Sequence, residues 1–182
     1  MGTIFKTRQE FLYPSKFENL KIEEGYTKKI RNTLIFLGLL LGSCQVSERP
    51  IEYGADECEY CKMMIMDQRY GSELVTEKGK VYTFDAAECL IDYLSYNEEM
   101  ADASKYLLVT PYTNPNQLID AKGATYLVSQ QMPSPMGAYL TAFTDREEAT
   151  AFQSTKGGIL YSWEEIFKDF KSIRLKAIEE FE

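Results

Sequence analysis

Sulfur-bearing side chains are concentrated in one short stretch of this sequence, and they are the residues best suited to chemistry. Two thiols and three thioethers occur within it: Cys58, Cys61, Met63, Met64 and Met66. The 182-residue chain contains no histidine. Thiolates and thioethers select soft ions, above all Cu(I), and a chain without imidazole cannot build an ordinary Cys/His zinc site or a mixed Cu(II) site. Any bound metal should therefore be held mainly by sulfur.

The spacing of Cys58 and Cys61 alone does not select one chemistry. Cys-x-x-Cys pairs occur in zinc sites, disulfides, redox centres and Cu(I) sites. A zinc site usually needs a second pair of ligands, whereas only Cys89 follows. A thioredoxin-like centre joins a strand to a helix, whereas this pair follows a polar segment. On spacing alone, the favoured interpretation is a disulfide, within the pair or between Cys58 and Cys89.

The neighbouring methionines shift this balance toward copper. Met63 lies two residues after Cys61, so in an extended backbone both side chains point to the same face. A thiolate and a thioether on one face would form a corner of a Cu(I) site. Met64 would point the other way, toward the core, and Met66 would lie off the Met63 face and pack.

A second sulfur-bearing segment is the proline-rich turn from Met132 to Met136, followed by Gly137. A stiff turn that presents two thioethers would lower the entropic cost of binding a metal. The alternative is that both methionines pack on neighbouring apolar surface, and the segment supports the two interpretations equally. Cys89, one turn into a predicted helix, is expected to be a buried structural thiol.

The elements that position these residues predict an α+β fold. Capping patterns are expected to open three helices: Asp85 with Glu88, Thr144 with Glu147, and Ser162 with Glu165. Short β-rich runs are expected as strands: 72–76, 80–84, 106–110, 124–129, 138–143 and 159–161. This order predicts two packed ββαβ units and a C-terminal helix. The first unit would span residues 57–115 and the second, with the helix, residues 116–182.

The N-terminal part is expected to direct export. Basic residues at 28–31 precede about ten apolar residues, fewer than the roughly 18 that span a bilayer as a helix. The following Leu41–Cys44 segment resembles a bacterial lipobox; the alternative is a secreted protein cut near Ser43. We expect residues 1–43 to be an extension and cleaved signal, Cys44 to be lipidated, and residues 44–56 to be a flexible tether.

The charge of the mature chain restricts its partners. Removing residues 1–43 leaves 13 basic and 24 acidic residues, a net charge of −11. Nucleic acid is therefore not an expected partner, and membrane attachment has to come from the lipid. Gln45 stands where an aspartate commonly retains lipoproteins in the inner membrane. We therefore expect a periplasm-facing protein of the outer membrane.

Several motifs, in order and after the lipobox, resemble the NosL family across residues 44–162. They are Tyr60-Cys61-Lys62-Met63, Phe84-Asp85, Met136-Gly137-Ala138, Phe143, Asp145-Arg146-Glu147-Glu148-Ala149, Phe152 and Gly157-Gly158. NosL proteins are lipid-anchored copper-binding accessory proteins for nitrous oxide reductase. The resemblance implies the double ββαβ fold, Cu(I) binding, and delivery to nitrous oxide reductase or its copper-assembly machinery.

The resemblance also implies a set of ligands. The family's Cys-x-Met motif corresponds to Cys61 and Met63, and its Met-Gly turn corresponds to Met136; Cys58 is an additional cysteine. We predict a non-enzymatic Cu(I) carrier with Cys61 as the anchoring ligand, Met63 and Met136 as thioether ligands, Cys58 as a possible further ligand and Met132 as a substitute. The alternatives are a thiol–disulfide oxidoreductase using Cys58 and Cys61, and a structural lipoprotein with a disulfide.

Overall fold

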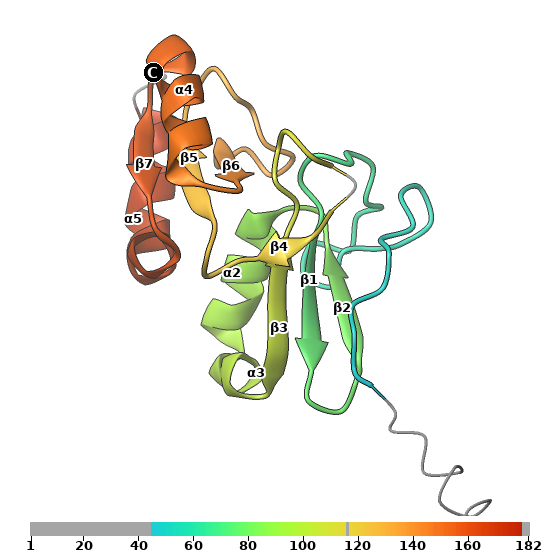
Figure 1. The fold of residues 1–182 in the computed structure, drawn as a ribbon. Helices are drawn as coiled ribbons and strands as arrows, with labels where there is room; N and C mark the ends of the chain where they lie inside the picture. The colour runs from blue at the N-terminus through green and yellow to red at the C-terminus, as the bar shows by residue number, and fades with distance from the viewer. Residues whose placement is uncertain (1–44, 116, 180–182) are drawn as a thin grey trace, which may run out of the picture. The chain divides into compact units, whose positions relative to one another are not determined.

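The computed structural model describes residues 45–115 and 117–179, so the predicted signal and the lipidated Cys44 lie outside the described residues. The strands form two antiparallel sheets, in the orders β2-β1-β3-β4 and β6-β5-β7 (Figure 1). The elements in chain order are β1 (Ser72–Thr76), β2 (Val81–Phe84), α2 (Ala87–Tyr96), α3 (Glu98–Asp102), β3 (Ser104–Val109), β4 (Ile119–Asp120), β5 (Thr125–Val128), β6 (Leu140–Phe143), α4 (Arg146–Lys156), β7 (Ile159–Tyr161) and α5 (Trp163–Glu179). The predicted mixture of helices and sheets is confirmed.

The first sheet is built on the β1–β2 hairpin. Ser72 lies opposite Phe84, and Val75 lies opposite Val81. Gly79 in the connecting turn has a φ of +81°, a conformation that glycine adopts without steric cost. β4 also pairs with β3 in this sheet. The first sheet therefore extends past residue 115, where the sequence analysis placed the boundary between the two units.

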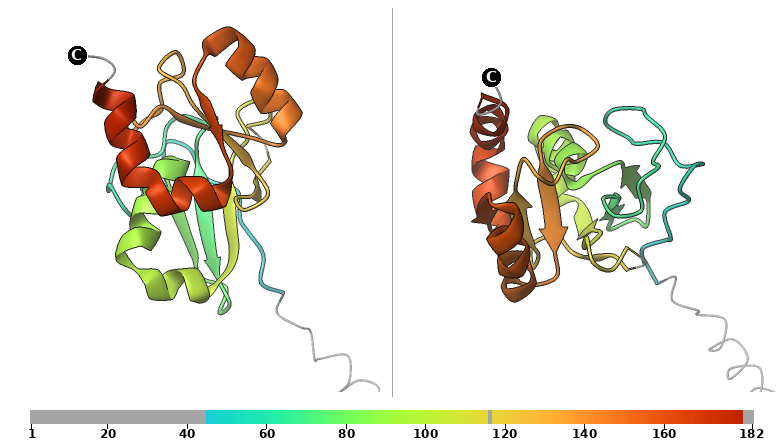
Figure 2. Two further views of the ribbon diagram at one scale, coloured as in Figure 1. Left: turned by 90° about the vertical axis from the view of Figure 1, so that its left-hand side faces the viewer. Right: turned by 90° about the horizontal axis from the view of Figure 1, so that it is seen from above.

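Residues 45–56, expected to be a tether, contact the domain through Ile51 and Tyr53. From Gln45 onward the chain belongs to the same compact unit as the rest of the domain. The segment follows the face of the first sheet opposite α2 (Figure 2). Ile51 is buried, and a β carbon added at Gly71 would lie 2.7 Å from its Cδ1 atom and 2.8 Å from the Tyr53 hydroxyl. Ile51 and Tyr53 are two residues apart, so an extended backbone turns both toward the sheet.

The second sheet has β5 at its centre, with α4 and α5 packed against it. α5 buries residues three or four positions apart, the spacing of one helix face: Trp163, Ile166, Phe170, Ile173 and Ala177. The helix is kinked at Asp169, whose φ is −115°. None of the helices in the described part of the chain is long and apolar enough to cross a membrane.

The helix starts in the second half agree closely with the capping predictions. At α5 the Ser162 N–H donates to the Glu165 carboxylate (2.8 Å), and the Glu165 N–H donates to the Ser162 hydroxyl (3.3 Å), as predicted. At α4 the cap is Asp145, which accepts from the Glu148 N–H (2.9 Å). The prediction of Thr144 as the cap is therefore wrong by one residue.

The start of α2 differs more strongly from its prediction. The N-cap is Ala86, which makes no side-chain capping bond, and the predicted capping box of Asp85 and Glu88 is wrong. Both carboxylic side chains are buried instead. The spacing of these two residues fits a capping box, but α2 begins in the interior, where tertiary partners decide what their side chains contact.

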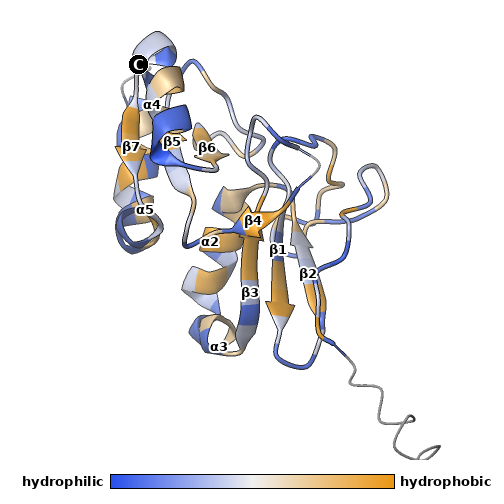
Figure 3. Cartoon of the chain, in the orientation of Figure 1, coloured by the Kyte–Doolittle hydropathy of each residue, from blue (hydrophilic) through white to orange (hydrophobic). Residues whose placement is uncertain are grey.

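α2 lies between the two sheets and contacts β1 and β2 of one and β6 of the other. Apolar residues are concentrated in the strands and in α2 (Figure 3). The larger core cluster contains Leu74, Leu90 and Leu140 together with Cys58 and Cys89. A smaller cluster belongs to the second sheet and α4: Leu127, Met132, Phe143 and Ala149. The core of the domain therefore carries two of the thiols into the region where the sheets meet.

Candidate metal centre

Cys89, which is distant in sequence, joins the neighbouring Cys58 and Cys61 in one cluster of thiols. The Sγ atoms of Cys58, Cys61 and Cys89 all lie within 4.8 Å of one another. All three are free thiols. Cys58 and Cys89 are buried, whereas Cys61 is partly exposed. Solvent therefore reaches the cluster at Cys61, whereas Cys58 and Cys89 are covered by the protein.

The loop from Cys58 to Met63 folds back on itself and directs its two cysteines toward each other. The Lys62 N–H donates to the Cys58 carbonyl (2.9 Å), and the Cys58 N–H donates to the Met63 carbonyl (2.8 Å). Lys62 has a φ of +61°, in the left-handed region. The Glu59 N–H donates to the Thr83 carbonyl (2.8 Å), which attaches the loop to β2. Because these hydrogen bonds fix the loop backbone, the Cys58 and Cys61 thiols are held in place before any metal binds.

Cys89 reaches the cluster from the first turn of α2. Its N–H bonds the Ala86 carbonyl (3.0 Å), so the residue belongs to the helix start. A helix N-terminus carries a partial positive charge and stabilises a nearby thiolate. The sequence analysis expected Cys89 to be buried, which is confirmed, but did not identify it as a candidate ligand. The available signal was that only three cysteines follow Cys44.

The three thiols have unequal proton affinities. A hydrogen bond from the Cys89 thiol lowers the pKa of Cys58 to about 5, although burial opposes the shift. The same bond raises the pKa of Cys89 far above its usual range. Burial raises the pKa of Cys61. One thiolate, at Cys58, is therefore favoured at neutral pH, and the cluster already holds a nucleophilic sulfur ligand in its metal-free form.

The methionines after Cys61 do not lie as an extended strand would place them. Met64 is 51% exposed, so the prediction that it packs in the core is wrong. The fully buried residue of this stretch is Ile65, whose N–H donates to the Asp56 carbonyl (2.9 Å). The left-handed turn at Lys62 breaks the simple alternation of side chains on which the prediction depended.

Met63, Met64 and Met66 are exposed and line an open depression of about 440 Å³. The depression is completed by Asp67, Arg69, Asp85, Pro133, Ser134 and Pro135. Asp85 lines this depression and also lies near Cys58. Burial raises the pKa of the Asp85 carboxyl group, and the negative charge of the Cys58 thiolate raises it further. Three thioethers therefore line an open depression that includes Asp85, a neighbour of Cys58.

The two methionines of the proline-rich turn have different surroundings. Met132 is buried in the smaller core cluster with Leu127 and Phe143, separate from the core that contains the cysteines. Met136 is half-buried and packs against the core that includes Cys58 and Cys89. The structure therefore places Met136, but not Met132, against the core to which the thiols belong.

Glu88 ties this turn to the helix that carries Cys89. Its carboxylate is fully buried and accepts hydrogen bonds from the Ser134 hydroxyl (2.8 Å) and the Met136 N–H (2.6 Å). Burial raises the pKa of Glu88 to about 7, and both donors oppose the increase. The sequence analysis assigned Glu88 to a helix cap and missed this contact, for which no local pattern gives a signal.

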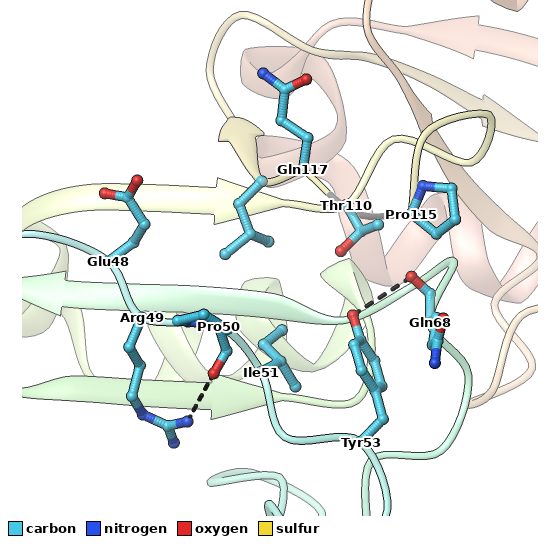
Figure 4. A pocket seen from close by; sticks show the side chains of 10 residues that line it. Glu48, Arg49, Pro50, Ile51, Tyr53, Gln68, Thr110, Pro115 and Gln117 are labelled. Carbon is cyan, nitrogen blue, oxygen red and sulfur yellow. Dashed lines mark hydrogen bonds between the residues drawn. The ribbon is translucent and has the colours of Figure 1, made fainter.

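A larger depression lies elsewhere, on the outer face of the first sheet. It has a volume of about 530 Å³ and lies between residues 48–53 and a second segment that contributes Pro115, Gln117 and Leu118 (Figure 4). Arg49, Tyr53 and Thr110 are among the residues that line it, and none of its lining residues is a cysteine or methionine. The sulfur chemistry of the described residues is therefore not located in this pocket.

The fold and the thiol cluster together define a small sulfur-rich metal-binding protein. The NosL family model matches residues 51–170, and the chain belongs to the NosL family. The copper-binding lipoprotein NosL of Stutzerimonas stutzeri is 32% identical over 129 residues, which are 67% of this chain and 68% of that protein. Both comparisons confirm the family resemblance noted in the sequence.

A solved structure supports the same relationship. The crystal structure of the copper chaperone NosL from Shewanella denitrificans superposes with a TM-score of 0.57 at 26% identity. The match covers 67% of this chain and 96% of that chain. These relatives are named as copper-handling proteins and not as enzymes, in agreement with the prediction that this chain is not an enzyme.

Proposed function

We propose that this protein binds one Cu(I) ion at the cysteine cluster and transfers it to nitrous oxide reductase or its copper-assembly machinery. The observation that carries the proposal is the approach of the Cys58, Cys61 and Cys89 Sγ atoms to within 4.8 Å of one another. Three convergent sulfur donors without imidazole suit a soft monovalent ion. The copper-binding names of the relatives support the same choice.

Each ligand has a distinct role in this proposal. Cys58 and Cys89 hold the ion from the buried side, and Cys61, which is partly exposed, is the ligand that an incoming protein displaces first. Met136 is the thioether ligand of the bound ion, the exposed Met63 binds the ion during capture and release, and Met132 is left to the core. Neutral thioethers bind Cu(I) more weakly than thiolates, so they favour release as well as capture.

The choice of Cu(I) over zinc follows from the ligand types. Zinc in a structural site takes four ligands, usually thiolate or imidazole, whereas a fourth cysteine or any histidine is missing from residues 45–182. The exposed methionines near the cluster offer thioethers, which are ligands for Cu(I) and not for zinc. A competition experiment with both metals under reducing conditions should therefore leave copper bound.

We further propose that the chain is attached by a lipid on Cys44 and faces the periplasm from the outer membrane. The lipoprotein name of the Stutzerimonas stutzeri relative supports the attachment. Mass spectrometry of membrane-extracted protein should give a lipidated N-terminal Cys44. Cys44→Ala should release the protein into the soluble fraction, and unmodified protein in the soluble fraction of the wild type would contradict this part of the proposal.

The test of the function is a titration of reduced protein with Cu(I) against a chromophoric chelator, in oxygen-free buffer. The wild type should bind one equivalent, and Cys58→Ser, Cys61→Ser and Cys89→Ser should each weaken binding by at least about tenfold. Met132→Leu is the matched control and should bind like the wild type. Transfer is then tested with copper-free nitrous oxide reductase and its assembly proteins as acceptors. Unchanged affinity in all three serine variants would contradict the site.

The second candidate is a thiol–disulfide oxidoreductase, favoured by one observation. The lowered pKa of Cys58, with Cys61 close by, is typical of an attacking thiolate and its resolving partner. Oxidation would join two of the thiols, and an incoming disulfide would be reduced to two thiols. A redox titration that gives a reversible disulfide, combined with serine variants that bind copper normally, would favour this function over copper transfer.

A further inference from the structure

The contact between Glu88 and the proline-rich turn has an energetic cost that calls for a reason. Glu88 is 0% exposed, and burying a carboxylate is unfavourable unless hydrogen bonds compensate for lost water. Its two carboxylate oxygens bond different groups of a single turn, the Ser134 hydroxyl at 2.8 Å and the Met136 N–H at 2.6 Å. Both bonds are short and shielded from water, so this contact fixes the turn closely.

The backbone of the turn at residues 133–137 is restricted to few conformations. Pro133 and Pro135 restrict its backbone, and the Gly137 N–H donates to the Ser134 carbonyl (3.0 Å). The Ser134 hydroxyl, which donates to Glu88, also accepts from the Leu140 N–H (3.3 Å) and so extends the network to the start of β6. Glu88 is therefore the point at which α2 and the second sheet's turn are joined by polar bonds.

The residue after Glu88 is Cys89, and the residue whose N–H Glu88 binds is Met136. One side chain thus fixes the Met136 backbone relative to a helix that carries a thiol of the cluster. Met136 also packs against the core that contains Cys58 and Cys89. The geometry points to a defined placement of the Met136 sulfur, which a purely apolar contact of a flexible methionine would not ensure.

We propose that Glu88 is a positioning residue of the copper site. Its buried carboxylate holds the Ser134–Met136 turn so that the Met136 thioether completes the coordination of an ion bound by the three cysteines. The inference rests on the proposed Cu(I) function. It adds an explanation of how Met136, in the turn before β6, is held near the thiols of Cys58, Cys61 and Cys89. Groups behind a first ligand commonly determine metal affinity in this way.

A double-mutant cycle on Cu(I) affinity tests the proposal with the full chain and Cu(I) alone as the probe. Glu88→Leu and Met136→Leu should each weaken binding by about tenfold, because Glu88→Leu frees the turn that presents the thioether and Met136→Leu removes the thioether itself. The double variant should bind no more weakly than the single variants. Fully multiplicative losses would show that Glu88 does not act through Met136 and would overturn the inference.

X-ray absorption of the copper-loaded proteins provides a readout that a merely structural role would not change. The number of sulfur neighbours of copper should fall by one in both Glu88→Leu and Met136→Leu, and should stay at the wild-type value in Met132→Leu. If Glu88→Leu does not fold, Ser134→Ala keeps the carboxylate and the Met136 bond while removing one donor, and should lose part of the affinity. A wild-type sulfur count in Met136→Leu would overturn the proposal without any Glu88 variant.

The two levels of the proposal fail differently. If the wild type does not bind Cu(I), or if the serine variants of the three cysteines bind it normally, the proposed function is wrong and Glu88 has no copper site to organise. If the wild type binds through the cysteines and the cycle is multiplicative, only the role of Glu88 is wrong.

Discussion

The backbone N–H of Cys61 lies 3.4 Å from the Sγ atom of Cys58 and donates a hydrogen bond to it. This bond runs from the second cysteine of the pair to the first and contributes to the lowered pKa of the Cys58 thiol. It also holds the loop in a shape in which both thiols face the same point. The Cys-x-x-Cys pair is therefore organised to share an ion, with Cys89 as the third donor from α2.

Cys89 provides the sharpest distinction between a ligand and a structural thiol. We expect Cys89→Ser to lower Cu(I) affinity by at least about tenfold, since it removes one of three sulfur donors. Serine is similar in size, so the free energy of unfolding of the metal-free protein should change by only about 1–2 kcal/mol. A chelator competition assay and urea denaturation measure the two quantities. Normal affinity with lowered stability would identify Cys89 as structural only.

Lys62 is predicted to store strain in the loop between the cysteines and the methionines. Its φ of +61° disfavours residues with a β carbon, so Lys62→Gly should raise the free energy of unfolding by about 1 kcal/mol. Lys62→Val should lower it by roughly 1–2 kcal/mol, because a β-branched residue fits this conformation poorly. Lys78→Gly, in an exposed turn, is the control and should give no gain. Equal effects at Lys62 and Lys78 in urea denaturation would exclude strain at Lys62.

Glu73 in β1 should make stability depend on pH. Burial raises its pKa from 4.5 to about 7, although Arg49 opposes the shift and Glu48 and Asp56 add to it. Above pH 4.5 the unfolded chain loses a proton that the folded state keeps until about pH 7, so stability falls as pH rises through this window. Glu73→Gln should flatten the slope and be more stable at pH 8 by up to roughly 3 kcal/mol.

The measurement for Glu73 is urea denaturation of the metal-free protein at several pH values. The exposed Glu52→Gln serves as the control and should keep the wild-type slope. Glu88, whose pKa is also raised to about 7, leaves some slope in every protein, so the comparison is the difference between the wild type and Glu73→Gln. Identical slopes in these two proteins would show that Glu73 is ionised in the folded state.

Gly71 should determine how tightly residues 45–56 lie on the first sheet. A β carbon at this position would approach Ile51 and Tyr53 within 2.8 Å, so Gly71→Ala should displace the segment and cost about 1–3 kcal/mol. Limited proteolysis should then cut within residues 45–56. Gly123→Ala, whose β carbon would meet its nearest atoms at 3.7 Å, is the matched control. Equal protease resistance in both variants would contradict the packing of this segment.

Local patterns were sufficient to predict most strands and the C-terminal helix. Short β-rich runs located β1 and β2, and the reciprocal bonds of Ser162 and Glu165 were readable from their spacing alone. β4 was missed because a two-residue strand carries no periodicity. The contacts of residues 45–56 were not predicted because two apolar side chains, Ile51 and Tyr53, are too few to stand out in a polar stretch.

The candidate site was only partly predictable, and the reason is tertiary. Cys58 and Cys61 are close in sequence, so their convergence follows from the loop that joins them. Cys89 and Glu88 act through partners distant in sequence, and their roles depend on where α2 lies between the sheets. Met64 was misplaced because one left-handed residue, Lys62, shifts the phase of every side chain that follows.

The central claim is that Cu(I) is held by sulfur from Cys58, Cys61 and Cys89. X-ray absorption at the copper edge of the Cu(I)-loaded wild type, compared with Cys89→Ser, tests it most directly. The account predicts a first shell of sulfur atoms only in the wild type, and one sulfur fewer in the variant. A first shell containing nitrogen or oxygen in the wild type, or an unchanged sulfur count in Cys89→Ser, would contradict it.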